Sequence, residues 1–178
     1  MRLAPALDPA LFSETERSVL LLDGECRAVG LTVAPVDVPD GPVVRAASLA
    51  GATARHDLVA ELWSAAWVHG VVEVLPLPLS LAVDVRASRR TKLISPAPRE
   101  AHFRSDDTER LGGVLVTSPL KTAYDLVRLD GTGAAEEVAA ALLRIAGLTP
   151  AIAAALAQLQ LGAPHKQRGI DRLAALPA

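Results

Sequence analysis

Aromatic residues are scarce in this chain: two Trp, two Phe and one Tyr make up 3% of its 178 residues. They are also scattered, at Phe12, Trp63, Trp67, Phe103 and Tyr124. Proteins that bind single-stranded nucleic acid by base stacking need aromatic platforms, so this composition counts against that mode of binding. Because 51% of the residues are hydrophobic, we expect a core built from Leu, Val and Ala.

Cysteine is nearly absent as well. The single Cys26 excludes an internal disulfide, and four scattered histidines give no recognisable zinc-ligand spacing. We therefore expect no metal or other cofactor, and a reducing cytoplasm as the default location.

Long hydrophobic runs are missing too. The longest apolar tract, residues 71–85, is interrupted by Glu73, Pro76, Pro78 and Asp84. It is too short and too interrupted to cross a bilayer, and the N-terminus lacks the basic and apolar pattern of a signal peptide. We expect no membrane partner.

The chain also lacks a global excess of positive charge, since its formal net charge is −2 and its pI about 6.1. One stretch departs from this balance, residues 86–104, which we call the basic segment. Only Glu100 opposes its six cations. These are Arg86, Arg89, Arg90, Lys92, Arg99 and Arg104. They are the candidate contacts for a phosphate backbone or an acidic protein surface. The alternative is a solvated loop whose charges keep a sheet edge from pairing with another chain.

Hydrophobic periodicity and turn residues predict strands in the first half of the chain and helices in the second. The expected helices cover residues 13–23, 44–54, 57–70, 119–131, 134–147, 150–162 and 168–176. The expected strands are a pair broken at Gly30, then residues 79–86, 100–105 and 113–118, with 105–113 as a polar connection. This pattern predicts an α+β fold with a small mixed sheet packed with helices and a helical C-terminal third.

Ser118 and Lys121 have the Ser-x-x-Lys spacing of serine enzymes in which a lysine at a helix start acts as the base. The further Ser-x-Asn and Lys-Thr-Gly elements of such enzymes are missing. We therefore interpret the spacing as an ordinary capped helix, with Pro119 in its first turn and Lys121 directed to water. Asp125 and Arg128 are expected on the exposed side of this helix.

Two other candidate chemistries are weak. A two-metal nuclease site would need Asp84 together with a Glu-x-Lys on a neighbouring strand, and no Glu-x-Lys occurs in the chain. His69 ends an apolar helix face, where a histidine is usually a hydrogen-bonded core residue rather than a ligand. We predict that the protein is not an enzyme.

Several stretches, in order and approximate spacing, resemble the AbiEi-type antitoxin family of type IV toxin–antitoxin systems, often described as transcriptional regulators. The resemblance covers residues 40–176 and is carried by His69-Gly70, by Arg104 to Asp107 and by Thr117 to Leu126. It implies an N-terminal winged helix that binds operator DNA, and a C-terminal domain that opposes a nucleotidyltransferase-type toxin without catalysis.

On this basis residues 1–42 are expected to form a remnant winged-helix-like segment, and residues 43–178 an AbiEi-like C-terminal α/β domain. Only one helix precedes the expected wing strands, and its Glu14 and Glu16 make it an unlikely groove binder. Some relatives carry a nuclease domain after the Arg-Gly segment, and this chain does not include one. Operator DNA, a toxin and a second copy of the chain are therefore the candidate partners. The alternative is a protein-interaction or dimerisation module with no nucleic-acid role.

Overall fold

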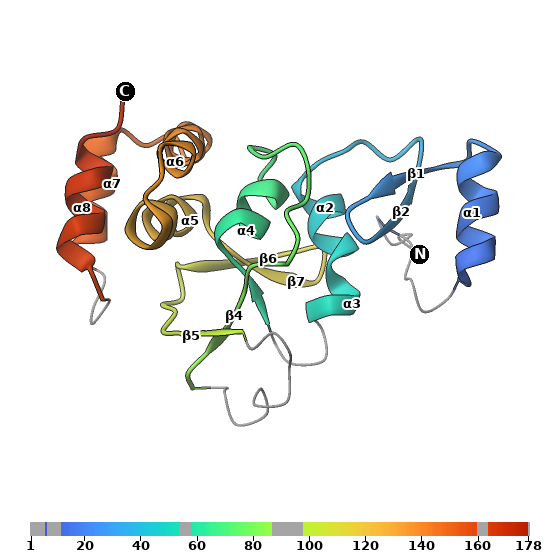
Figure 1. Cartoon of the computed structure of the whole chain (residues 1–178), viewed down its shortest axis with the longest axis horizontal. Coiled ribbons are helices and arrows are strands. Elements are labelled where there is room, and N and C mark those ends of the chain that lie inside the picture. The colour runs from blue at the N-terminus through green and yellow to red at the C-terminus, as the bar shows by residue number, and fades with distance from the viewer. Residues whose placement is uncertain (1–5, 7–11, 54–57, 87–97, 160–163, 178) are drawn as a thin grey trace.

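The computed structural model describes residues 6, 12–53, 58–86, 98–159 and 164–177, which form an α+β fold. A mixed five-stranded sheet lies in the middle of the chain, a two-stranded hairpin precedes it, and helices follow it (Figure 1). The hairpin consists of β1 (Cys26–Val29) and β2 (Thr32–Pro35). The sheet consists of β3 (Val59–Ala60), β4 (Leu81–Asp84), β5 (Arg99–Ala101), β6 (Thr108–Leu111) and β7 (Val114–Thr117).

The helices fall into three groups along the chain. The first is α1 (Glu14–Leu22) alone, and the second is α2 (Pro42–Ser48), α3 (Ala50–Thr53) and α4 (Leu62–Val68). The third is α5 (Pro119–Asp125), which continues as the π-helix η2 (Leu126–Asp130), then α6 (Gly133–Ile145), α7 (Pro150–Ala157) and α8 (Lys166–Ala174). The expected α+β class and the helical C-terminal region are confirmed.

The sheet has the order β5-β4-β3-β7-β6, which places the two-residue β3 at its centre. β3 pairs with β4 in antiparallel and with β7 in parallel orientation. The prediction of a helix from Asp57 was wrong in this respect, because Val59 and Ala60 are strand and the helix begins only at Leu62. A short apolar run buried on both faces has no period that separates strand from helix.

The polar connection expected over residues 105–113 was also wrong. Thr108–Leu111 is β6, and it forms an antiparallel hairpin with β7 through Gly112 and Gly113, both at positive φ. Paired glycines between two short strands are a hairpin pattern that the sequence does contain. The long strand expected over 79–86 is shorter, because only Leu81–Asp84 are strand.

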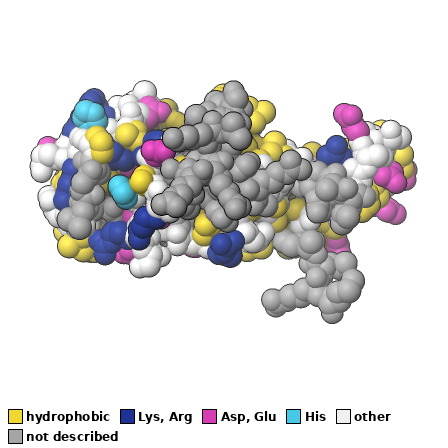
Figure 2. All heavy atoms as spheres, turned by 90° about the horizontal axis from the view of Figure 1, so that it is seen from below, with side chains coloured by type: hydrophobic (Ala, Val, Ile, Leu, Met, Phe, Trp, Pro, Cys, Tyr) yellow, Lys and Arg dark blue, Asp and Glu magenta, His cyan; other side chains and the backbone are white. Residues whose placement is uncertain are grey.

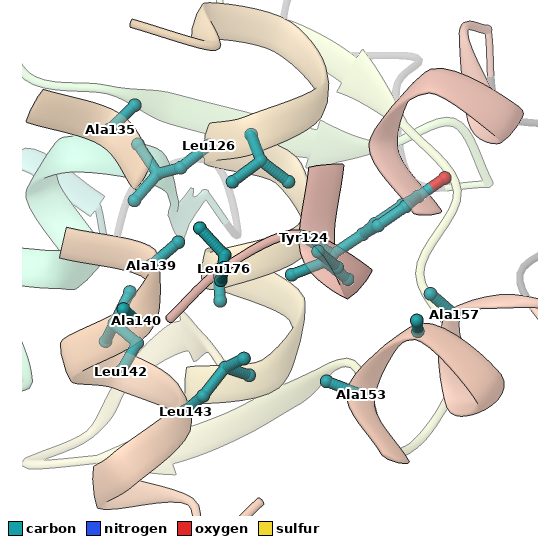
Figure 3. Packing of buried hydrophobic residues seen from close by; sticks show 14 of the residues in the cluster. Tyr124, Leu126, Ala135, Ala139, Ala140, Leu142, Leu143, Ala153, Ala157 and Leu176 are labelled. Atoms are coloured by element: carbon teal, nitrogen blue, oxygen red, sulfur yellow. The ribbon is translucent and has the colours of Figure 1, made fainter. Parts of the chain in front are cut away.

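The C-terminal helices confirm the caps expected from the sequence. Thr149 accepts a hydrogen bond from the Ile152 amide, and Pro150 occupies the first turn of α7. The helix start at Ser118 and Pro119 is also confirmed, although the Ser118 side chain makes no capping hydrogen bond. Figure 3 shows the small apolar residues of α6 and α7 facing the larger ones of α5 and η2 in one buried cluster.

The N-terminal part is built differently. Ser13 and Glu16 form a complete capping box at the start of α1, yet no residue within α1 is buried. The hairpin is closer to the body, because a Cβ at Gly30 would overlap the Ser48 Oγ and lie 2.7 Å from the Trp67 ring. α1 thus lies at one end of the molecule, beyond the hairpin (Figure 1).

In the described part of the chain, no single helix is long and apolar enough to span a membrane. α6 and α7 together are long and apolar enough by length and composition alone, but the two helices are bent by 95° relative to each other.

Candidate functional site

The basic segment begins two residues after β4 and contains the edge strand β5. Arg89, Arg90 and Lys92, three of its six predicted contacts, lie outside the described residues. Figure 2, which views the molecule from below, shows several Lys and Arg side chains on this face.

Arg86 is the most exposed of the three described candidates, with 70% of its side chain accessible. Its guanidinium lies 3.4 Å from the Asp84 carboxylate and also donates to the Phe103 carbonyl. Such an exposed ion pair contributes little to stability, roughly 0–1 kcal/mol, so Arg86 can exchange its partner for another anion at small cost.

Arg104 is half-exposed, and its guanidinium contacts one carboxylate and one backbone carbonyl. Its Nε lies 3.3 Å from the Asp106 carboxylate, and an Nη donates to the Leu159 carbonyl at 3.2 Å. The Leu159 contact links the loop after β5 to the end of α7, so Arg104 joins the sheet to the C-terminal helices.

Arg99 differs from the other candidates because its guanidinium contacts two buried carboxylates. Its Nε donates to Glu61 at 2.9 Å, its Nη2 also contacts Glu61, and the same group lies 3.5 Å from Asp125. Glu61 is only 2% exposed. Burial raises the pKa of the Glu61 carboxyl above its usual value, and the adjacent Arg99 guanidinium opposes that shift.

Asp125 is the centre of this buried ion network, which comprises Glu61, Arg99, Lys121, Asp125 and Arg128. Its Oδ1 accepts from Arg128 at 2.7 Å and from Lys121 at 3.2 Å. One carboxylate therefore contacts three cations from three elements, Lys121 of α5, Arg128 of η2 and Arg99 of β5. Removing a partner from a buried network leaves an uncompensated charge, which makes such networks sensitive to substitution.

This network corrects one expectation from the sequence. Lys121, Asp125 and Arg128 were expected at the exposed side of their helix, but each is less than a tenth exposed. Lys121 donates to Asp125 rather than to Ser118, which leaves the Ser-x-x-Lys pair without the contact that nucleophile activation needs.

Lys121, Asp125 and Arg128 follow an i, i+4, i+7 spacing and share one face of this helix. Apolar residues cover the other sides between residues 119 and 129, and such an amphipathic pattern predicts an exposed charged face, so the sequence did not indicate that these charges are buried. The apolar set is Leu120, Ala123, Tyr124, Leu126, Val127 and Leu129. Glu61 and Arg99 are distant in sequence, so their inclusion depended on the sheet topology.

His69 confirms its predicted role as a packed core residue. It is buried, and its Nε2 lies 2.8 Å from the Thr117 carbonyl, within hydrogen-bond distance. In the part of the chain that the structure covers, no three His, Cys, Asp or Glu residues are grouped so that they could hold a metal ion.

Comparisons of the chain with protein-family models, with curated proteins and with solved structures found no match.

Proposed function

We propose that this chain is a non-enzymatic regulatory protein of the antitoxin type that binds DNA through the basic segment. The observation that carries the proposal is the concentration of six cations against one carboxylate in residues 86–104, in a chain of net charge −2. The resemblance to AbiEi-type antitoxins supports the same proposal. It also supports residues 1–42 as a remnant winged helix and a toxin as partner of residues 43–178.

The contacts of the described cations divide the basic segment into two parts. Arg99 is bound within the buried ion network, and Arg104 bridges to α7, so both have structural roles already. Arg86, two residues after β4, contacts Asp84 and the Phe103 carbonyl, but at 70% exposed it is the most accessible described cation of the segment and can turn to a phosphate most easily. We therefore place the principal DNA contacts at Arg86 and its neighbours Arg89 and Arg90.

Fluorescence anisotropy with the duplex upstream of the chain's own gene, titrated across salt concentrations, tests this proposal. Each cation that no longer neutralises a phosphate reduces the slope of log K against log salt by about 0.9. The triple variant Arg86→Ala, Arg89→Ala, Arg90→Ala should therefore bind more weakly and with a shallower slope.

The matched control replaces three exposed arginines outside the basic segment, Arg110, Arg144 and Arg168, by Ala. It removes the same total charge and should keep nearly all of the affinity. Absence of binding at low salt, or equal weakening in both triple variants, would contradict the proposal.

A second candidate function, a protein-interaction or dimerisation module, is favoured by α1. Three large apolar side chains of this helix are exposed, Val19, Leu21 and Leu22, and Leu22 is 86% exposed. An apolar cluster on a helix with no buried residue is a feature of interaction surfaces. Sedimentation over a range of concentrations tests it, since a dimer formed through α1 should dissociate in Leu22→Glu and persist in Ile145→Glu, a change at an exposed position of α6.

A further inference from the structure

A small cavity of about 90 Å³ lies between the start of α5, the loop after β5 and the end of α7. Ser118, Lys121 and Tyr124 contribute from α5 and its cap, Arg104 and Asp107 from the loop. Since a water molecule in the liquid takes up about 30 Å³, there is room for several waters or for one small polyatomic ion.

Tyr124 is the unusual member of this lining. It is 1% exposed, and its hydroxyl has no hydrogen-bond partner among the described residues. A buried hydroxyl without a partner costs roughly 1–3 kcal/mol, so an unpartnered group in a native fold calls for a physical explanation. In Figure 3 the hydroxyl lies at the end of the ring that points away from Leu142 and Leu143.

The ring itself is held firmly on several sides. The Lys121 ammonium lies 5.4 Å and the Arg128 guanidinium 5.3 Å from its centroid. A Cβ at Gly169 of α8 would lie 2.9 Å from the Tyr124 Cε2, so the ring cannot turn toward that helix. Burial raises the pKa of the Tyr124 hydroxyl, which therefore remains a protonated hydrogen-bond donor near neutral pH.

The buried ion network lies on the α5 side of the cavity, where Lys121 is part of the lining. The network holds three cations, Arg99, Lys121 and Arg128, against two carboxylates, Glu61 and Asp125. This side therefore carries a surplus of one positive charge.

The loop side of the cavity carries the opposite sign. Arg104 offsets Asp106 at 3.3 Å, and the buried Asp107 carboxylate, which accepts the Arg104 backbone N–H at 2.9 Å, adds one negative charge. The positive side of the cavity is therefore at Lys121, which pairs with the Asp125 carboxylate that two arginines also contact.

We propose that this cavity binds a small oxyanion, a carboxylate or a phosphate, whose oxygens accept hydrogen bonds from the Tyr124 hydroxyl and the Lys121 ammonium. Such a ligand supplies the missing acceptor for Tyr124 and places its charge on the positive, Lys121 side of the cavity. This site is distinct from the proposed DNA contacts, so each can fail in experiment without the other.

Tyr124 is the only tyrosine of the chain, so ¹³C labelling of tyrosine rings gives NMR signals from this one site. Acetate, phosphate and chloride are titrated separately into the full-length protein at constant ionic strength. The Tyr124 signals should shift saturably with acetate or phosphate and stay unchanged with chloride. Comparison of the two oxyanions distinguishes a carboxylate site from a phosphate site. Signals that respond to neither would overturn the proposal and leave water as the occupant of the cavity.

Two variants assign the donors. Tyr124→Phe keeps the ring and removes only the hydroxyl. The oxyanion that shifts the Tyr124 signals should stabilise this variant less against thermal unfolding than it stabilises the original chain, by an amount that corresponds to about tenfold or more weaker binding. In Lys121→Gln, the remaining Tyr124 signals should no longer saturate in the same concentration range.

The matched control is Arg144→Gln, which removes an exposed cation of α6 and should behave like the original chain. Equal stabilisation of the original chain and Tyr124→Phe would overturn the assignment. If Lys121→Gln fails to fold, the comparison of Tyr124→Phe with the original chain still decides whether the Tyr124 hydroxyl binds the oxyanion.

Discussion

α1 leaves apolar side chains exposed, whereas α5 buries charged ones. α1 carries Val19, Leu21 and Leu22 at its surface and has no buried residue, whereas α5 buries Lys121 and Asp125. α1 contacts little besides β1, while α5 packs against α4, α6, η2 and α8. The difference teaches that in this protein the position of a helix in the fold, rather than the polarity of its residues, decides what is buried.

Each region also has its own means of stability. α1 depends on its capping box, because it has almost no tertiary packing to add. α5 combines an apolar core with an ion network that must stay complete. The following predictions test this contrast, from the largest expected effect to the smallest.

Asp125→Asn should cause the largest loss. It keeps the shape of the side chain but leaves Arg99, Lys121 and Arg128 without their common carboxylate, so the free energy of unfolding should fall by about 3–5 kcal/mol. Urea unfolding followed by circular dichroism measures it. The control Asp171→Asn, at an exposed position of α8, should change it by less than about 0.5 kcal/mol. A loss below about 1 kcal/mol in Asp125→Asn would show that the network does not stabilise this region.

Gly169→Ala should cost about 1–3 kcal/mol through overpacking. The added Cβ would lie 2.9 Å from both the Tyr124 Cε2 and the Arg128 Cβ, two groups that are themselves held in place. The same change at Gly133 of α6, where a Cβ meets nothing within 4 Å, should be neutral or slightly stabilising. Thermal unfolding of the pair provides the comparison, and equal behaviour of both variants would contradict tight packing at α8.

Cap removal compares the two regions directly. Thr132 caps α6 by accepting from the Ala135 amide, and Ser13 caps α1 by accepting from the Glu16 amide. Thr132→Ala should lower the global free energy of unfolding by about 1 kcal/mol. Ser13→Ala should leave it nearly unchanged and instead increase amide hydrogen exchange within α1 alone, because α1 can unfold without the core. A global loss in Ser13→Ala as large as in Thr132→Ala would show that α1 is part of the cooperative unit.

The smallest effect concerns the ion pair of Asp40 and Arg45, before and within α2. The Arg45 guanidinium, 2.7 Å away, lowers the pKa of the Asp40 carboxyl below its usual value of 3.8. A lowered pKa in the folded state means that the contribution is present above the unfolded pKa and is lost as pH falls through the folded one. Between pH 5 and about pH 3, the original chain should lose slightly more stability than Asp40→Asn. Since Asp40 is partly exposed, the difference should be roughly 0.2–1 kcal/mol. Parallel losses in the two chains would show that the pair contributes nothing.

The sequence predicted the features that depend on local chemistry. The caps at Ser13 and Thr149, the break at Gly30 and the packed His69 all follow from neighbouring residues or from one helix face. β3 was missed because two apolar residues fit a strand and a helix equally well, and only the pairing with β4 and β7 decides between them.

The candidate site was less accessible to sequence reasoning. The sequence does not distinguish the exposed Arg86 from the partly buried Arg99 within one basic segment. Glu61, the carboxylate that binds Arg99, lies 38 residues before it in the sequence. Lys121 and Asp125 share a charged helix face with Arg128, which as a pattern predicts exposure, and only the tertiary fold places them inside. The Tyr124 cavity likewise depends on α7 and on the loop after β5.

Gly30 has a consequence for how this protein can be assembled with others. The turn at Gly30 has no room for a side chain against Ser48 and Trp67, so the hairpin is fixed to the body at its turn, while α1 extends from its other end. In a winged helix, DNA lies beside a wing that is free at its turn. The turn at Gly30 is packed against the body, so a DNA duplex could not bind there in that way. A partner bound to α1 would instead be held in a set direction relative to the sheet, and the hairpin would then act as a spacer that determines the geometry of the complex rather than its strength.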